Sequence, residues 1–256
     1  MEVLGKDVDS LKKKLVDFIK KTVSDAGFAK VIVGLSGGLD SSLSAFLGVD
    51  ALGKEGVIGV KMPHKVTSPE SLADADLIIK TLSIKSYTVD ITERIEDYFK
   101  NFSDADNIRR GNKMARERMS ILYDLAKAER ALVMGTGNKT ERLLGYFTLH
   151  GDVACDINPL AEVYKTQVRA LAKEAGIPQK IIDKVPSAEL WKGQTDEGEL
   201  GMTYAEADKL LYLMIDKKYD DKRLMKEGFD RNLIKKIKDR IKSSEYKRKI
   251  PLIPAF

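Results

Sequence analysis

Apolar and polar residues alternate along the first 135 residues in a pattern that predicts helices and strands in turn. Apolar positions in residues 8–26 recur every three or four residues, as in a helix, and Gly27 follows as a C-cap. Short β-branched runs predict strands between the periodic stretches. The further elements predicted in this part are strands 30–35, 57–62, 86–90 and 131–135 and helices 41–53, 69–83, 92–101 and 112–129. This order predicts an α/β fold, a doubly wound parallel sheet with helices on both faces.

The regular alternation of predicted strands and helices does not continue in the second half of the chain. Periodic apolar residues predict helices 163–175, 203–216 and 230–243. Residues 186–202 are polar, contain glycine and lack a period, so we expect a mobile lid loop there, and residues 251–256 read as an extended tail. Composition does not shift enough to mark a boundary, so residues 1–256 are expected to form one domain.

A glycine turn follows the strand predicted at 30–35. Its residues read Gly34-Leu35-Ser36-Gly37-Gly38-Leu39-Asp40-Ser41-Ser42, and a helix is predicted directly afterwards. Such a junction presents backbone N–H groups and the positive end of a helix dipole, which suit a phosphate. Glycines let the backbone approach an anion with no Cβ in the way, and the serines add hydroxyl donors. The segment therefore predicts a phosphate-binding loop, the alternative being an ordinary turn with Ser and Asp as helix caps.

This turn differs from a Walker A loop, because no lysine follows its glycines. Asp40 stands nearby instead, and a carboxylate beside phosphates repels them unless a divalent cation lies between. Asp40 thus argues for Mg²⁺. The loop resembles that of the N-type ATP pyrophosphatases, which cleave ATP to AMP and pyrophosphate and activate a substrate by adenylation.

Polar turns also follow two other predicted strands, at Pro63-His64 and at residues 135–138. The carboxyl ends of parallel strands form the rim at which α/β sheets bind ligands. We therefore expect the three turns to share one rim.

Composition excludes several classes of protein. No apolar stretch is long enough for a membrane span, and residues 1–14 are charged, without the apolar core of a secretory signal. The single cysteine, Cys155, excludes an internal disulfide and suggests a reducing, cytoplasmic setting. The net charge of +5 is concentrated in residues 217–249, with 14 Lys/Arg against six Asp/Glu. Helical spacing there favours a solvated helix face over a nucleic-acid site.

Four further segments, in order, give the chain a more specific resemblance. They are residues 111–119 (GNKMARERM), 135–152 (GTGNKTE, GYFT and GD), 156–168 (DINPL and VYKTQV) and 186–204 (PSAEL, QTDE, ELG and Y). With the loop at 34–42 they resemble the ammonia-dependent NAD⁺ synthetases over residues 10–254. The resemblance implies an adenine-nucleotide α-hydrolase-like fold and amidation of deamido-NAD⁺ to NAD⁺ through an acyl-adenylate.

The resemblance assigns the ATP side of the site. It implies Mg²⁺ between Asp40 and Glu141, with Lys165 complementing the triphosphate charge and ATP as co-substrate. The other ATP-binding residues implied are the loop 34–42 together with Lys61, Thr136 and Ser187. From the residues alone, Glu141 could be a solvated residue in the first turn of a helix, and Lys165 a surface lysine.

The resemblance also assigns the deamido-NAD⁺ side. Asn112 and Arg116 are four residues apart on one predicted helix and share a face. The residues implied to bind deamido-NAD⁺ are Asn112, Arg116, Tyr123, Asp152, Asp156, Tyr246 and Lys247. Asp152 is also implied to hold or deprotonate ammonium, and Tyr123 to lie near a homodimer interface.

Two positions depart from the family pattern. Tyr246 precedes Lys247 and Arg248 where the family commonly has histidine, so the role of that histidine is open. Lys61 stands where many relatives have arginine, which keeps the charge but loses the bidentate fork.

Cys155 lacks the flanking residues of a nucleophile and reads as a packed thiol, and with His64 and His150 it makes no metal-ligand spacing. Relatives that use glutamine carry an additional domain with a catalytic cysteine. The implied nitrogen donor is therefore free ammonia, or ammonia from a separate glutaminase.

Two rival readings stay open. One is another adenylating ATP pyrophosphatase, either a GMP-synthetase-like subunit or a tRNA-modifying enzyme. The other is a nucleotide-sensing module without chemistry. Residues 111–119 argue against the first, and Asp40, Glu141 and Lys165 together argue against the second.

Overall fold

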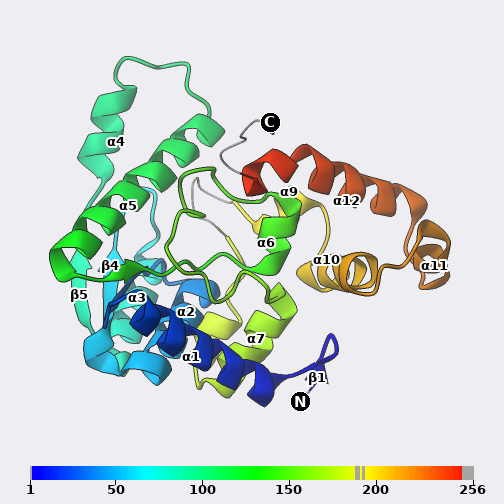
Figure 1. Ribbon diagram of the computed structural model, residues 1–256. Coiled ribbons are helices and arrows are strands. Elements are labelled where there is room, and N and C mark those ends of the chain that lie inside the picture. Colours follow the sequence, from blue (N-terminus) through cyan, green and yellow to red (C-terminus); the bar gives the residue numbers. More distant parts are fainter. Residues whose placement is uncertain (1, 188–190, 192–193, 250–256) are drawn as a thin grey trace, which may run out of the picture.

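A parallel sheet of four strands in the order β5-β4-β3-β6 forms the centre of the computed structural model, which describes residues 2–187, 191 and 194–249 (Figure 1). The strands are β3 (Val31–Gly34), β4 (Val57–Lys61), β5 (Lys85–Thr88) and β6 (Leu132–Val133). Val31 of β3 pairs with Val57 on one side and with Leu132 on the other. The chain moves outward from β3 to β4 and β5 and returns to β6 on the other side. The topological switch point therefore lies between β3 and β6.

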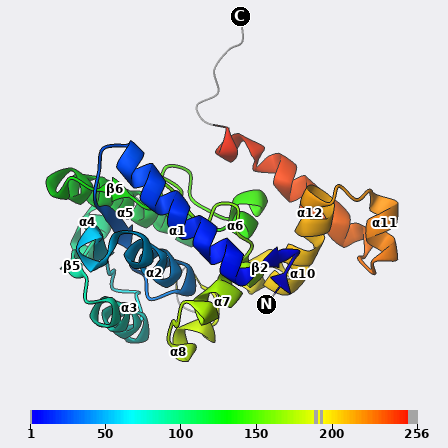
Figure 2. The same ribbon diagram turned by 60° about the horizontal axis from the view of Figure 1, so that its bottom comes forward.

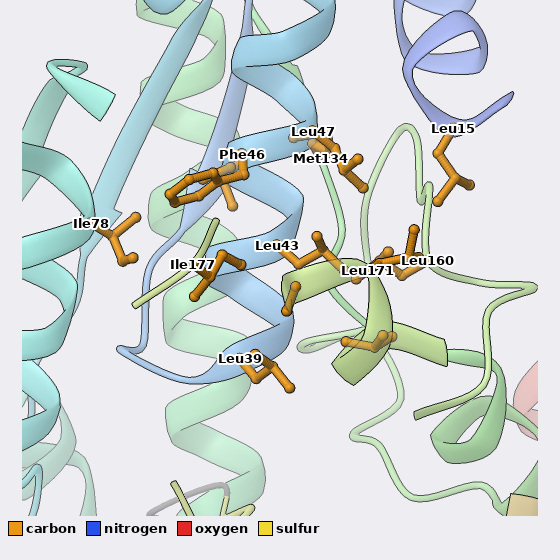
Figure 3. Close-up of a cluster of buried hydrophobic side chains, with 14 of the residues drawn as sticks. Leu15, Leu39, Leu43, Phe46, Leu47, Ile78, Met134, Leu160, Leu171 and Ile177 are labelled. Carbon is orange, nitrogen blue, oxygen red and sulfur yellow. The ribbon is translucent and has the colours of Figure 1, made fainter. Parts of the chain in front are cut away.

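Helices cover both faces of the sheet, as the alternation predicted. The helices of this half are α1 (Val8–Asp25), α2 (Leu39–Leu52), α3 (Pro69–Leu82), α4 (Thr92–Phe99), α5 (Asn107–Glu129) and α7 (Lys165–Glu174). Successive residues of β3 belong to different core clusters, because strand side chains alternate between faces. Val31 and Val33 pack with α1, α2 and α7, whereas Ile32 packs with α4 and α5. Figure 3 shows the first of these clusters, where Leu15, Leu43 and Leu171 come from α1, α2 and α7.

A third cluster of buried residues lies away from the sheet. It joins α6 (Lys139–Leu144) to α10 (Tyr204–Leu211), α11 (Asp221–Lys226) and α12 (Arg231–Ser243). Figures 1 and 2 both show α11 and α12 at the opposite end of the molecule from α4. Among the described residues, no helix is long and apolar enough to cross a membrane. That residues 1–256 form a single domain stays a prediction.

The structure corrects several predicted boundaries. Helix α2 begins at Leu39 rather than at residue 41, and α5 begins at Asn107, five residues before the predicted start. The predicted helix 203–216 is α10 followed by a π-helical turn, Tyr212–Asp216. Elements that the sequence pattern did not predict are the hairpin β1 (Glu2–Val3) and β2 (Lys6–Asp7), α6, α8 (Gln179–Ile182), α11 and the short 3-10 helices Lys54–Gly56 and Glu245–Arg248.

The segment predicted as a lid, residues 186–202, is not wholly irregular. Residues Asp196–Leu200 form α9, which begins with the Thr195 hydroxyl accepting from Gly198 N and ends at Gly201 with φ +69°. A helix of five residues is too short to show an apolar period, which is why the pattern missed it. Residues 188–190 and 192–193 of this segment, and the predicted tail 251–256, lie outside the described residues.

Candidate active site

The glycine turn joins the end of β3 to the start of α2 at the switch point. Gly37 has φ +77°, and a Cβ added there would lie 2.1 Å from the Ser71 carbonyl oxygen, so only glycine fits. Hydrogen bonds within the turn hold its shape: Gly38 N donates to the Ser36 hydroxyl (3.2 Å), and the Ser42 hydroxyl donates to Gly38 O (2.8 Å). Because α2 begins at Leu39, Asp40 lies in the first turn of the helix. The predicted phosphate loop is thus a preformed turn at a helix N-terminus.

A second turn follows β6, the strand next to β3 in the sheet. Ser44 of α2 donates its hydroxyl to Gly135 O at 3.2 Å, which connects the two turns. Asn138 then caps α6 in a reciprocal capping box with Glu141. The fully buried Asn138 also donates from Nδ2 to Asp40 Oδ1 at 3.0 Å. One amide side chain therefore fixes the start of α6 and the Asp40 carboxylate together.

Lys165 brings the two predicted carboxylates together. Its ammonium forms an ion pair with Asp40 and lies 3.8 Å from Glu141 Oε1. The Lys165 side chain is 6% exposed, whereas those of Asp40 and Glu141 are 17% and 19% exposed. The sequence left open a surface role for Lys165 and a solvated role for Glu141, and neither side chain is in such a position.

Burial and charge oppose each other in this cluster. Burial by itself lowers the pKa of the Lys165 ammonium, but Asp40 and Glu141 outweigh it and raise that pKa above its ordinary value. Burial and the neighbouring Asp40 raise the pKa of the Glu141 carboxyl, and the nearby Lys165 lowers it. Lys165 therefore stays charged at neutral pH.

Residues from α9 and α10 complete the surroundings of Lys165. The Lys165 ammonium lies 5.2 Å from the centre of the Tyr204 ring, within reach of a cation–π contact. Tyr204 and Tyr146 donate their hydroxyls to the buried Asp196 at 3.0 and 3.1 Å. Burial raises the pKa of the Asp196 carboxyl. Asp196 belongs to the predicted lid, residues 186–202. The described part of this segment therefore contacts the rest of the protein beside Lys165.

The donor set at Asp40 and Glu141 suits a hard divalent cation. Two carboxylates converge on one position, where the single ammonium of Lys165 balances only one of their two negative charges. Mg²⁺ in nucleotide sites takes one or two carboxylates and completes its six oxygens with phosphates and water. Within the described part of the chain no group of three or more His, Cys, Asp or Glu residues is arranged to hold a metal. The pair therefore fits a metal that is shared with a phosphate ligand.

The remaining residues predicted for ATP differ in their settings. Leu35 and Leu39 bury their side chains in the first core cluster, so an ATP contact from them would involve their backbone. Lys61 ends β4 and forms an ion pair with Asp76 of α3. Thr136 and Ser187 are both half-buried, and Thr136 lies in the turn after β6.

Most residues predicted for deamido-NAD⁺ lie in, or contact, the segment between the end of α6 and Ile157, which forms a β-bridge with Met134. Asn112 accepts from the Thr148 hydroxyl at 2.9 Å, and Arg116 donates to Leu149 O at 3.1 Å. Asp152 accepts from Thr148 N at 2.8 Å. These contacts bring the side chains of α5 and the 148–152 turn to one place, and their binding of deamido-NAD⁺ stays a prediction.

Tyr123 and Asp156 meet at the end of β6. Asp156 accepts from the Tyr123 hydroxyl at 3.3 Å and from Val133 N at 2.7 Å. Burial and the Asp156 charge raise the pKa of Tyr123 to about 12, so the phenol stays neutral. A hollow of about 430 Å³ lies beside them, and its lining includes Tyr123, Phe147, Cys155, Lys247 and Arg248.

Tyr246, Lys247 and Arg248, where the chain differs from the family's His-Lys-Arg motif at the first position, have different roles. Lys247 donates to Gly145 O and Phe147 O, both at 2.9 Å, and Arg248 donates to the carbonyls of Arg142 and Leu143 at the end of α6. Tyr246 is 52% exposed. The two cations thus hold the wall of the hollow, while Tyr246 stands at the surface.

The sequence did not single out two residues that shape the site, Asn138 and Asp208. Asn138 could have been found from the spacing Asn-x-x-Glu, which is that of a capping box. Asp208, a fully buried residue of α10 that accepts from Thr166 N of α7 at 2.7 Å, carries no local signal.

A glycine turn, a buried lysine and two carboxylates lie together at the switch point of a parallel sheet, an arrangement typical of α/β proteins that bind a nucleotide phosphate. The model of the NAD synthase family matches residues 11–251. The chain belongs to this family.

Known proteins agree with this placement. The chain is 47% identical over 253 residues, 99% of its length and 98% of the other's, to an NH₃-dependent NAD⁺ synthetase from Fusobacterium nucleatum. An NMN synthetase structure from Francisella tularensis superposes with a TM-score of 0.87 at 33% identity, covering 98% of this chain and all of that one. A glutamine-dependent NAD⁺ synthetase from Acinetobacter baumannii gives a TM-score of 0.69 at 29% identity, and the match covers 98% of this chain but 47% of that one.

Proposed function

We propose that this chain amidates deamido-NAD⁺ to NAD⁺ with ATP and ammonia, the last step of NAD⁺ synthesis. The nicotinate carboxylate attacks the α-phosphorus of ATP, and pyrophosphate leaves. Ammonia then attacks the carbonyl carbon of the acyl-adenylate, and AMP leaves with one of the carboxylate oxygens. The observation that carries the proposal is the meeting of Asp40, Glu141 and Lys165 beside the glycine turn.

Neither step needs a nucleophile from the protein, so catalysis rests on alignment and charge. The glycine turn at the start of α2 offers backbone N–H groups to the pyrophosphate, and Lys165 neutralises charge on the phosphates. Lys61, Thr136 and Ser187 are assigned to the rest of ATP. These roles agree with the position of the turns at the carboxyl ends of the strands, where α/β sheets bind ligands.

Asp40 and Glu141 would hold Mg²⁺ against the phosphates, as their convergence on one cation position supports. The metal would supply charge neutralisation for the leaving pyrophosphate. Asn138 fixes the Asp40 carboxylate through its amide, which orients one of the two ligands in advance.

The nicotinate half is assigned to the surroundings of Asn112, Arg116 and Asp152, and the hollow lined by Tyr123 and Lys247 lies close by. Along α6, Glu141 and Asp40 both lie beside the Lys165 ammonium, while Arg142 lines that hollow. Two consecutive residues of α6 therefore lie on different sides of the proposed site, Glu141 on the ATP side and Arg142 on the deamido-NAD⁺ side. Asp156 and Tyr246 are assigned to the same substrate, and Asp152 to ammonium.

A second candidate substrate is nicotinate mononucleotide, because the Francisella tularensis structure named NMN synthetase covers nearly the whole chain. We favour deamido-NAD⁺ on the higher identity to NH₃-dependent NAD⁺ synthetases. Deamido-NAD⁺ has an additional adenylate half, whose binding energy can be used at the reacting carboxylate. We therefore expect kcat/KM for deamido-NAD⁺ to exceed that for nicotinate mononucleotide by about tenfold or more.

Pyrophosphate release and the amide product should be measured with each substrate under identical ATP and ammonium. A preference for nicotinate mononucleotide would establish the second candidate. Release with neither substrate would overturn both.

We also propose a homodimer whose interface includes α5. Several apolar residues of α5 are half-buried in the single chain (Met119, Ile121, Leu122, Tyr123 and Leu125). All of them except Met119 pack on the second core cluster, so Met119 is the position left for a partner. Light scattering should give twice the 28.5 kDa chain mass, and Met119→Lys should shift the protein toward monomer.

The matched control is Lys127→Glu, a charge change at an exposed position of the same helix. It should leave the mass unchanged. A monomer in the unmodified protein at working concentration would contradict the proposal. A cytoplasmic location and a separate glutaminase as ammonia source also stay predictions.

A further inference from the structure

Asp208 is a buried carboxylate that joins the two helices carrying Glu141 and Lys165. Its side chain is on α10 and is fully buried. One oxygen accepts from the Thr140 hydroxyl of α6, and the other accepts from Thr166 N of α7 at 2.7 Å. Thr140 directly precedes Glu141, and Thr166 directly follows Lys165. Asp208 therefore contacts the neighbours of both site residues.

Thr140 extends this contact to Lys165 itself. Its hydroxyl donates to Asp208 and accepts from Lys165 N at 3.0 Å, which uses the single donor and one acceptor of the hydroxyl. A continuous set of hydrogen bonds thus runs from the Asp208 carboxylate through Thr140 to the Lys165 backbone. All three side chains are buried, so water does not replace these bonds easily.

The same carboxylate satisfies the start of α7. The first N–H groups of a helix have no partner within it, and Lys165 N and Thr166 N are two of these. Helix α7 has no acidic residue in its own first turn, and it places the positive Lys165 at the positive end of its dipole. The negative charge of Asp208 takes the place of the missing acidic residue and offsets the repulsion between Lys165 and the positive end of the dipole.

Helix α10 holds Lys165 at its other end as well. Tyr204, one turn before Asp208, places its ring 5.2 Å from the Lys165 ammonium. Helix α10 thus contacts the charged group of Lys165 directly, through Tyr204, and its backbone indirectly, through Asp208 and Thr140. A role confined to general stability would not require contacts at both ends of one side chain.

We propose that Asp208 is a positioning residue for the adenylation step, setting the place of Lys165 relative to Asp40 and Glu141 through Thr140 and the start of α7. The proposal rests on the role proposed above for Lys165. Asp208 touches neither ATP nor the metal, and acts by holding the lysine where the phosphate charge develops.

A double-mutant cycle tests this. Asp208→Asn keeps the size of the side chain but removes the charge and turns an amide N–H₂ toward a donor. Because misplacement of a catalytic group by about 1 Å costs about 100-fold, we expect kcat for pyrophosphate release to fall about 10- to 100-fold. The KM for ATP should change less than kcat. In the Lys165→Met background the same substitution should add less than a further twofold loss, about the scatter of independent sites.

A purely structural Asp208 would give a different result. The loss of kcat would then be equal in both backgrounds and would follow the melting temperature, and this outcome would overturn the proposal. Thr140 offers a second test should Asp208→Asn not fold. Thr140→Val keeps the shape and removes the hydroxyl, and Thr140→Ser restores it, so the serine variant should recover most of the kcat that the valine variant loses.

The cycle also separates this proposal from the one on which it rests. If Lys165→Met itself leaves kcat unchanged, the role of Lys165 is wrong. If Lys165→Met lowers kcat while Asp208→Asn and Thr140→Val do not, only the positioning role is wrong.

Discussion

Replacement of Asp40 by Asn should abolish pyrophosphate release while leaving the fold intact. The amide has the size of the carboxylate but no charge, so it removes one of two anionic ligands for Mg²⁺. It also removes one of the two carboxylates beside the Lys165 ammonium. We expect a loss of at least about 100-fold in kcat, the scale found when one preorganised electrostatic partner of a transition state is removed.

Two further variants make this test sharper. Glu141→Gln removes the second carboxylate but keeps the capping box of α6, because glutamine also serves at that position. It should therefore lose pyrophosphate release with an unchanged melting temperature. Asp50→Asn is the matched control, since Asp50 lies in the last turns of the same helix as Asp40 and pairs with Lys12 at 3.0 Å. Near-normal turnover in either site variant would refute the metal assignment.

Ammonium, and not glutamine, should be the direct nitrogen donor of the purified chain. Burial raises the pKa of the Cys155 thiol to about 11, and the thiol donates to Val153 O, which is the setting of a packed thiol rather than of a nucleophile. The chain corresponds to 47% of the glutamine-dependent synthetase that it matches. We expect NAD⁺ from ammonium chloride and none from glutamine alone. Glutamine-dependent turnover that survives Cys155→Ala would contradict this.

The rate of the ammonia step should rise with pH at a fixed, subsaturating total of ammonium. The attacking species is neutral NH₃, and ammonium, like the ammonium group of lysine, is almost wholly protonated at pH 7. The neutral fraction, and with it the rate, should grow by about tenfold from pH 7 to pH 8. Pyrophosphate release in a single turnover without ammonium gives the control, because it reports the pH dependence of adenylation alone. A flat ratio between the two rates would indicate that a group such as Asp152 deprotonates ammonium within the site.

The sheet and its helices could be predicted because their signals are local. The β-branched runs at 31–33 and 57–60 and the periodic helices between them carry their own pattern, and the structure confirms the doubly wound sheet. Helix α6 has six residues and α9 has five, too few for a period, so the apolar pattern predicted neither, although Glu141 was considered as a residue in the first turn of a helix. The early start of α5 was missed because Gly111 stands near it, although that residue is buried within the helix.

The site was predictable to the extent that it rests on turns at strand ends. The alternation of strands and helices predicted that the turns after residues 30–35 and 131–135 share one rim, and the family resemblance paired Asp40 with Glu141. The structure places β3 next to β6, so both residues follow neighbouring strands. Asn138 and Asp208 act through contacts 98 and 42 residues away along the chain, with Asp40 and Thr166. These contacts arise only when α2 packs beside α6, and α10 beside α7, and no local pattern records them.

The central claim, that the carboxylate is activated as an acyl-adenylate, is tested most directly by following its oxygen. Deamido-NAD⁺ labelled with ¹⁸O in the nicotinate carboxylate should be converted with ATP and ammonium, and the AMP analysed by mass spectrometry. We expect one labelled oxygen in the phosphate of each AMP and none in pyrophosphate. AMP without label, or ADP with labelled inorganic phosphate as the products, would contradict it.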